Sequence, residues 1–116
     1  MLHKFSTPDV TFLGEQDGAP ERRLKEALAV LLRLNATVMR AYLARVLYDG
    51  TTNGVMLGLL TDDEEECPKL VNQVGKAFAA LFNTKAHLDI VFLNGAQDAE
   101  IRQACPPFYD RKTSYN

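Results

Sequence analysis

The chain has 116 residues, the length of one ordinary domain, and it is 47% apolar and 24% charged. This balance is typical of a globular protein and excludes a disordered chain. The net charge of -2 argues against a nucleic-acid-binding or anionic-membrane-binding protein, because both need a basic surface. No apolar run reaches the length of a transmembrane helix, so we expect no membrane partner.

The chain divides into an N-terminal arm (1–9), one α+β domain (10–109) and a polar tail (110–116). The opening MLHKFSTPDV lacks the apolar stretch of a secretory signal. The two cysteines, Cys67 and Cys105, form no CxxC pair. Together these features predict a cytoplasmic location.

The first half of the domain reads as strand, helix and hairpin. A short strand is predicted over Val10–Gly14, followed by a turn and an amphipathic helix over Glu21–Leu34 that Pro20 opens. Strands over Val38–Tyr48 and Gly54–Leu60 flank Asp-Gly and Asn-Gly pairs, which favour the left-handed backbone of tight turns. This pattern predicts an antiparallel hairpin.

The second half reads as helix, strand and short helix. A second amphipathic helix is predicted over Pro68–Phe82 and a strand over Leu88–Asn94. Asn94 and Gln97 have the spacing of a capping box, which predicts a last short helix ending before Pro106.

The element order β-α-β-β-α-β, with the short C-terminal helix added, predicts a ferredoxin-like fold. In that fold two helices cover one face of a four-stranded antiparallel sheet. The strands, however, carry apolar residues on both faces, as in Val91 and Leu93 opposite Ile90 and Phe92. We therefore expect something to cover the second face: a second subunit, another domain, or the chain ends including Phe5, Phe108 and Tyr109. Four residues on this face are candidate interface anchors: Tyr42, Tyr48, Val91, Leu93.

The five consecutive acids over 62–66 have three interpretations. Thr61 and Glu64 fit a capping box, and acids in a first helical turn are favoured by the helix dipole. Pro68 would break a helix that began so early, so the helix start is alternatively delayed to Pro68. An acidic docking patch is also open, whereas the run lacks the alternation and central glycine of a calcium loop. We expect no metal and no cofactor.

Few residues suggest catalysis. Cys67 precedes a proline at a helix start, which makes it a candidate reactive thiol, although a buried or capping cysteine explains it equally simply. His87 has no partner at metal-ligand spacing and is expected to pair with Asp89. The two serines lie near the termini, so a serine triad is not expected, and the glycines form no phosphate loop.

Several stretches resemble the C-terminal domain of the enhanced serine sensitivity protein B family. These are AYLA at 41–44, GLLTD at 58–62, HLDI at 87–90 and PFY at 107–109, within a similarity from about Val10 to Tyr109. The family has no established catalytic residues, so the resemblance supplies none here. Its name records a serine-sensitivity effect. The domain commonly follows another domain, so the chain is either a stand-alone version or an excised piece.

These observations predict a non-enzymatic protein-interaction or oligomerisation module, with a homo-oligomer or a partner domain on the open sheet face. The alternative is a regulatory domain that binds a small metabolite such as an amino acid. In that case the loops 50–54 and 83–87 would help to form the pocket.

Overall fold

The structure is a computed structural model, and it describes residues 10–35, 37–62, 68–82 and 88–111. The arm 1–9, most of the acidic run, Cys67, His87 and the end of the tail lie outside these residues. The helices and strands follow in chain order: β1 (Val10–Glu15), α1 (Ala19–Arg33), β2 (Val38–Tyr48), β3 (Thr52–Thr61), α2 (Pro68–Leu81), β4 (Asp89–Leu93), α3 (Gly95–Ala104), β5 (Tyr109–Asp110).

The local sequence signals for helix and turn boundaries are confirmed. Pro20 lies in the first turn of α1, and α2 is described from Pro68 onward, whereas residues 63–67, on which the choice between the early and the delayed start depends, lie outside the described residues. Asn94 and Gln97 form the capping box of α3. Asp49 and Gly50 adopt positive φ angles of 52° and 71° in the β2–β3 turn. Asn53-Gly54, in contrast, is already part of β3 rather than of the turn.

The sheet is mixed, so the prediction of four antiparallel strands is wrong. The strand order is β1-β2-β3-β4, in which β1 and β3 are antiparallel to β2 and β4 is parallel to β3. This is also not the ferredoxin-like order. The reason is the position of β4: it lies directly beside β3, and a crossover through a helix between neighbouring strands makes them parallel.

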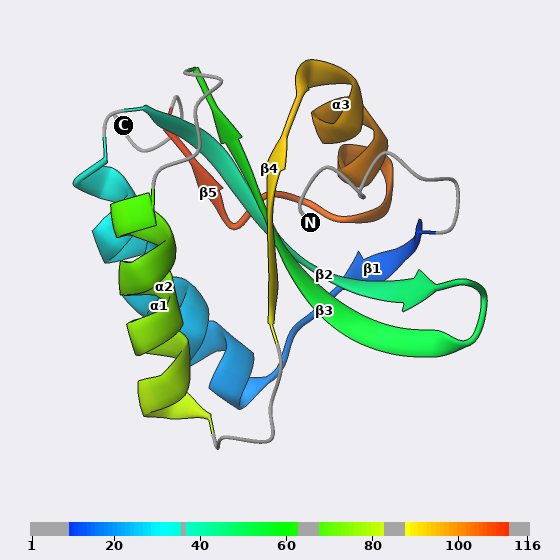
Figure 1. The fold of residues 1–116 in the computed structure, drawn as a ribbon, viewed down its shortest axis with the longest axis horizontal. Helices are drawn as coiled ribbons and strands as arrows, with labels where there is room; N and C mark the ends of the chain where they lie inside the picture. Colours follow the sequence, from blue (N-terminus) through cyan, green and yellow to red (C-terminus); the bar gives the residue numbers. More distant parts are fainter. Residues whose placement is uncertain (1–9, 36, 63–67, 83–87, 112–116) are drawn as a thin grey trace.

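The two ends of the described chain share one edge of β2. β1 pairs with β2 from Tyr48 to Ala44, and β5 continues along the same edge by pairing with Ala41 and Arg40 (Figure 1). The amide of Arg111 donates to the carbonyl of Met39 at 2.9 Å. Asp110, predicted as the first residue of the polar tail, therefore belongs to strand β5 of the sheet.

Helices cover both faces of the sheet. α1 and α2 lie side by side on one face and α3 lies on the other (Figure 1). The first core cluster, on the α1–α2 side, consists of these buried residues: Leu24, Leu28, Leu32, Val38, Ala41, Leu43, Leu57, Leu59, Leu70, Val74, Tyr109. The second core cluster, on the α3 side, consists of these: Tyr42, Ala44, Val46, Met56, Leu60, Val91, Leu93, Ile101, Cys105.

The second sheet face is apolar, as predicted, but the chain covers it with its own last helix. Ile101 of α3 is fully buried in the second core cluster. Two of the chain-end aromatics do not take this place, because Tyr109 belongs to the first core cluster and Phe108 packs against it, while Phe5 lies outside the described residues. The short C-terminal helix was predicted as an element, but its role as the cover was not.

Candidate functional site

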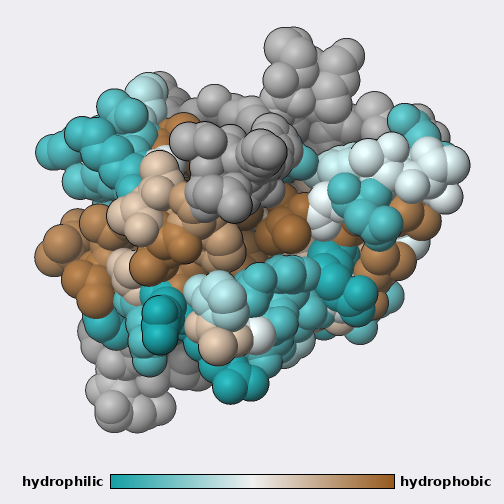
Figure 2. Space-filling view, turned by 90° about the horizontal axis from the view of Figure 1, so that it is seen from below, coloured by the Kyte–Doolittle hydropathy of each residue, from teal (hydrophilic) through white to brown (hydrophobic). Residues whose placement is uncertain are grey.

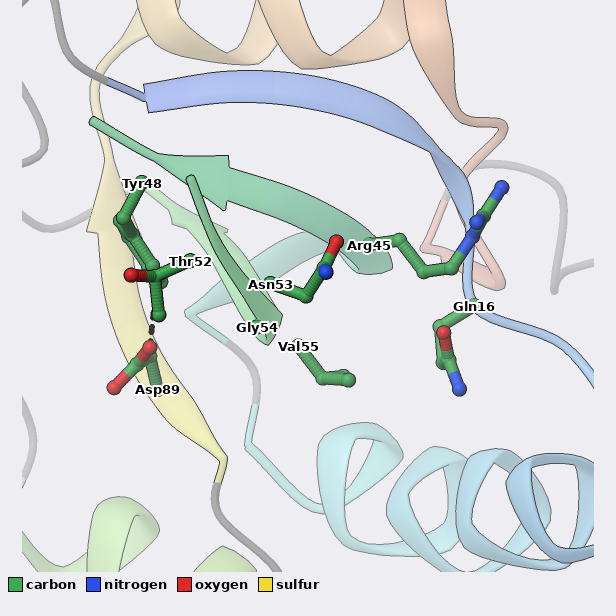
Figure 3. A pocket seen from close by; sticks show the side chains of 8 residues that line it. All are labelled: Gln16, Arg45, Tyr48, Thr52, Asn53, Gly54, Val55 and Asp89. Carbon is green, nitrogen blue, oxygen red and sulfur yellow. Dashed lines mark hydrogen bonds between the residues drawn. The ribbon is translucent and has the colours of Figure 1, made fainter. Parts of the chain in front are cut away.

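A hollow of about 670 Å³ lies at the end of the β2–β3 hairpin. It forms there because β4 begins at Asp89, which pairs with Met56, so β3 extends past β4. The lining comes from the segment after β1, from both hairpin strands and from the start of β4 (Figure 3). The lining residues are Gln16, Arg45, Tyr48, Thr52, Asn53, Gly54, Val55, Asp89.

Arg45 provides a cation at this hollow. Its strand position opposite Gly14 leaves it without a large neighbour on β1, and its side chain is exposed. The guanidinium has no hydrogen-bond or ion-pair partner within the parts of the chain that the structure describes. A guanidinium presents several donors in a fixed fork, which suits a carboxylate.

Gln16 lies on the same side of the hollow as Arg45 (Figure 3). Its backbone amide donates to the carbonyl of Leu43 at 2.9 Å, and its side-chain Nε2 donates to Glu21 Oε2 at 3.1 Å. A carboxylate only accepts hydrogen bonds, so the amide nitrogen must face Glu21. The Gln16 Oε1 atom remains as an acceptor.

An ion-pair group holds the segment that carries Gln16. The Lys25 ammonium, with a side chain only 11% exposed, contacts Glu15 Oε2 at 2.5 Å and Asp17 Oδ1 at 3.3 Å. These two acids flank Gln16 in sequence. The contacts fix the segment between β1 and α1, and with it the position of Gln16 at the hollow.

The opposite side of the hollow is formed by Tyr48 and Asp89. The Tyr48 hydroxyl donates to Asp89 Oδ2 at 2.5 Å (Figure 3). Burial, together with this hydrogen bond, raises the pKa of Tyr48 far above its ordinary value. A Cβ on Gly54 would lie 2.7 Å from the Tyr48 ring, so only glycine lets this ring lie against β3.

A second polar group lies under α3, away from the hollow. Asp98 is 4% exposed and accepts hydrogen bonds from Arg40 Nε at 3.1 Å, Arg40 Nη2 at 2.8 Å and the Tyr42 hydroxyl at 2.6 Å. Burial alone would raise the pKa of Asp98, but the hydrogen bonds from Arg40 and Tyr42 outweigh it and lower that pKa. Burial also raises the pKa of Tyr42 to about 12, aided by Asp98. The group fastens α3 to β2.

The structure changes the set of interface candidates. Tyr42, Val91 and Leu93 are at most 6% exposed and belong to the second core cluster, so they are not surface anchors. The interface prediction is wrong for a physical reason. These residues lie on the second apolar face of the sheet, and α3 of the same chain covers that face. Tyr48 is half-buried and lines the hollow.

Of the two cysteines, Cys105 lies within the described residues. Cys67 lies outside the described residues, as does His87, the predicted partner of Asp89. Cys105 is buried, and burial raises its pKa to about 11, so it stays a thiol at neutral pH. Within the described part of the chain, no three His, Cys, Asp or Glu residues gather where they could hold a metal ion.

Sequence reasoning missed Gln16, Arg45 and Asp98. The signal for Arg45 was a charged residue among the apolar residues of a strand, a feature that it shares with Arg40. Asp98 had a comparable signal, an acid in the first turn of a helix that follows an apolar strand. Its partner Arg40 is 58 positions away, so no local pattern could join them.

Together, the fold and the hollow define a small α+β domain with a mixed sheet between two helical layers and, at one hairpin end, a hollow lined by both polar and apolar groups. The family model described as the SseB protein C-terminal domain matches residues 13–111, and the chain belongs to this family. No curated protein and no solved structure matches the chain. None of the described helices has the length and hydropathy to cross a membrane.

Proposed function

We propose that this domain binds rather than catalyses, and that the hollow at the hairpin end takes a small polar molecule that carries a carboxylate. The observation that supports this proposal is the guanidinium of Arg45, exposed at the hollow without a partner among the described residues. A charge-assisted hydrogen bond to such a group contributes about 1.5–3 kcal/mol.

The neighbouring groups narrow the class of ligand. The acceptor Oε1 of Gln16 lies on the Arg45 side, and the Asp89 carboxylate lies on the other. A molecule with both a carboxylate and an ammonium group would pair with the Arg45 cation and with the Gln16 acceptor beside it. A free amino acid has this chemistry, and serine is the first to test because the family is named for serine sensitivity.

A thermal-shift screen of amino acids tests this proposal. At a ligand concentration a hundred times Kd, binding stabilises the folded state by about 2.7 kcal/mol, which raises the Tm of a domain of this size by several degrees. Arg45→Gln should abolish most of this rise, since the carboxylate loses its charged donor. The same amino acid with its carboxylate blocked as an amide should also fail to raise the Tm.

Arg33→Gln is the matched control, because Arg33 is an exposed arginine in the last turn of α1 and not part of the hollow. It should leave the shift unchanged. A panel without any shift, or equal shifts for the two variants, would remove the proposal.

We also propose, as a second candidate, that the domain is an interaction module that binds a second subunit or a partner domain. The observation that favours it is the outer edge of β4, which has no strand beside it among the described residues. Apolar surface is present as well: Figure 2 shows an apolar band over the side where α1 and α2 lie, and Leu81 of α2 is 40% exposed.

The free buried thiol of Cys105 fits the cytoplasmic location expected from the sequence.

A further inference from the structure

The outer edge of β4 has the properties of a strand that another strand can join. Among the described residues, β4 is the edge strand of the sheet next to β3. Its five residues, DIVFL, carry one charge, at the first position. The strand pairs with β3 in unbroken register from Met56↔Asp89 to Leu60↔Leu93. Within the described chain, no strand pairs with its other side. An edge of this kind offers a row of unpaired backbone donors and acceptors.

The other terminal strand, β1, is protected against such pairing. Its register with β2 shifts between Phe12 and Gly14, which marks a bulge or irregularity in this strand. Bulges and charges are the common means by which proteins prevent edge-to-edge association. β4 has no bulge, and its one acid is bonded to Tyr48. Of the two edges, only that of β4 is regular.

We propose that β4 pairs antiparallel with β4 of a second copy of this chain, with Val91 opposite Val91 at a two-fold axis. The two sheets would then be continuous. This inference rests on the interaction function proposed above, not on the ligand hollow.

The distribution of charge favours the antiparallel arrangement. In this register Asp89 of one copy lies opposite Leu93 of the other, and Ile90 lies opposite Phe92. A parallel pairing in register would instead place Asp89 beside Asp89, and neighbouring like charges are destabilising. Pairing of five residues buries little surface, so the dimer is weak and forms at high micromolar concentration.

Cysteine cross-linking tests the register. In a background with Cys67→Ser and Cys105→Ala, Val91→Cys should give a covalent dimer on mild oxidation, because directly opposite Cβ atoms lie within disulfide reach. Ile90→Cys alone and Phe92→Cys alone should each give several-fold less. A mixture of these two variants should cross-link as a heterodimer.

The wild-type chain supplies a test that no substitution can disturb. Sedimentation velocity should show a dimer that grows with concentration. Hydrogen exchange of β4 amides should slow at the concentrations where the dimer forms.

If the chain associates but β4 exchange and Val91→Cys cross-linking do not respond, the edge inference is wrong and the interaction function stands. If the chain stays monomeric at high micromolar concentration and β4 exchange is unchanged, the edge inference and the second-subunit form of the interaction function are both wrong.

Discussion

At the scale of single residues, the buried carboxylate of Asp98 has the largest consequence for stability. Three donors from Arg40 and Tyr42 surround it, so its charge is compensated although it is 4% exposed. Removing one member of such a buried pair leaves the other charge without a partner, which costs about 3–5 kcal/mol. Asp98 is therefore a structural residue, whereas Arg45 has no partner among the described residues and is the residue that we propose contacts a ligand.

Asp98→Asn should lower the free energy of unfolding by about 3 kcal/mol at pH 7. The folded-state pKa of Asp98 lies below the ordinary 3.8, so its contribution is complete above that pH and is lost as the pH falls through the folded-state value. The difference between wild type and variant should therefore shrink in strong acid. Urea unfolding followed by circular dichroism at pH 7 and pH 3 measures both effects.

Asp49→Asn is the control for this variant, because Asp49 is exposed and has a left-handed backbone that asparagine tolerates. Its effect should stay within about 0.5 kcal/mol. Equal losses for the two variants would contradict the role given to Asp98.

At the scale of elements, α3 decides how the second sheet face is used. Its capping box supplies two reciprocal hydrogen bonds of 2.8 Å between Asn94 and Gln97. Its close approach to the sheet depends on Gly58, where a Cβ would lie 3.0 Å from Leu93 and 3.5 Å from Ile101. The helix is short, so its cap is a large part of what keeps it folded.

Asn94→Ala should destabilise the domain by about 1 kcal/mol, because the backbone amide of Gln97 loses its acceptor, the Asn94 side chain. Amides of α3 should exchange faster than in the wild type. Gln103→Ala is the matched control, since Gln103 is an exposed polar residue of the same helix outside its cap. A loss no greater than that of the control would show that the cap is dispensable.

At the scale of the whole molecule, β2 and β3 join the two core clusters. Leu43 and Leu57 face the first cluster, while Tyr42 and Met56 face the second. Each cluster thus depends on strands that also belong to the other. We expect the domain to unfold as one unit.

Ile101→Ala should lower the free energy of unfolding by about 2–5 kcal/mol, because it opens a cavity at a fully buried position. If the two clusters are coupled, the slowest amides of α1 should exchange faster by the same free energy as those of α3. Val30→Ala, at an α1 position that is 52% exposed, should have little effect on either. Faster exchange confined to α3 would show that the second cluster opens independently.

The sequence by itself determined the helices and the first four strands, their order and the apolar character of both sheet faces, but not the short strand β5. These depend on local chemistry: the Asp49-Gly50 turn, Pro20 and Pro68 at helix starts, the Asn94–Gln97 cap and the periodicity of apolar residues. Only the tertiary structure decided that β4 lies parallel to β3, that α3 covers the second face and that Arg40 meets Asp98. Packing in three dimensions decides which strands are neighbours and which residues far apart in the chain meet. The periodicity of apolar residues along a strand is the same whichever strand lies beside it. The hollow at Arg45 has the same origin, because it exists only where the hairpin extends past the first residue of β4.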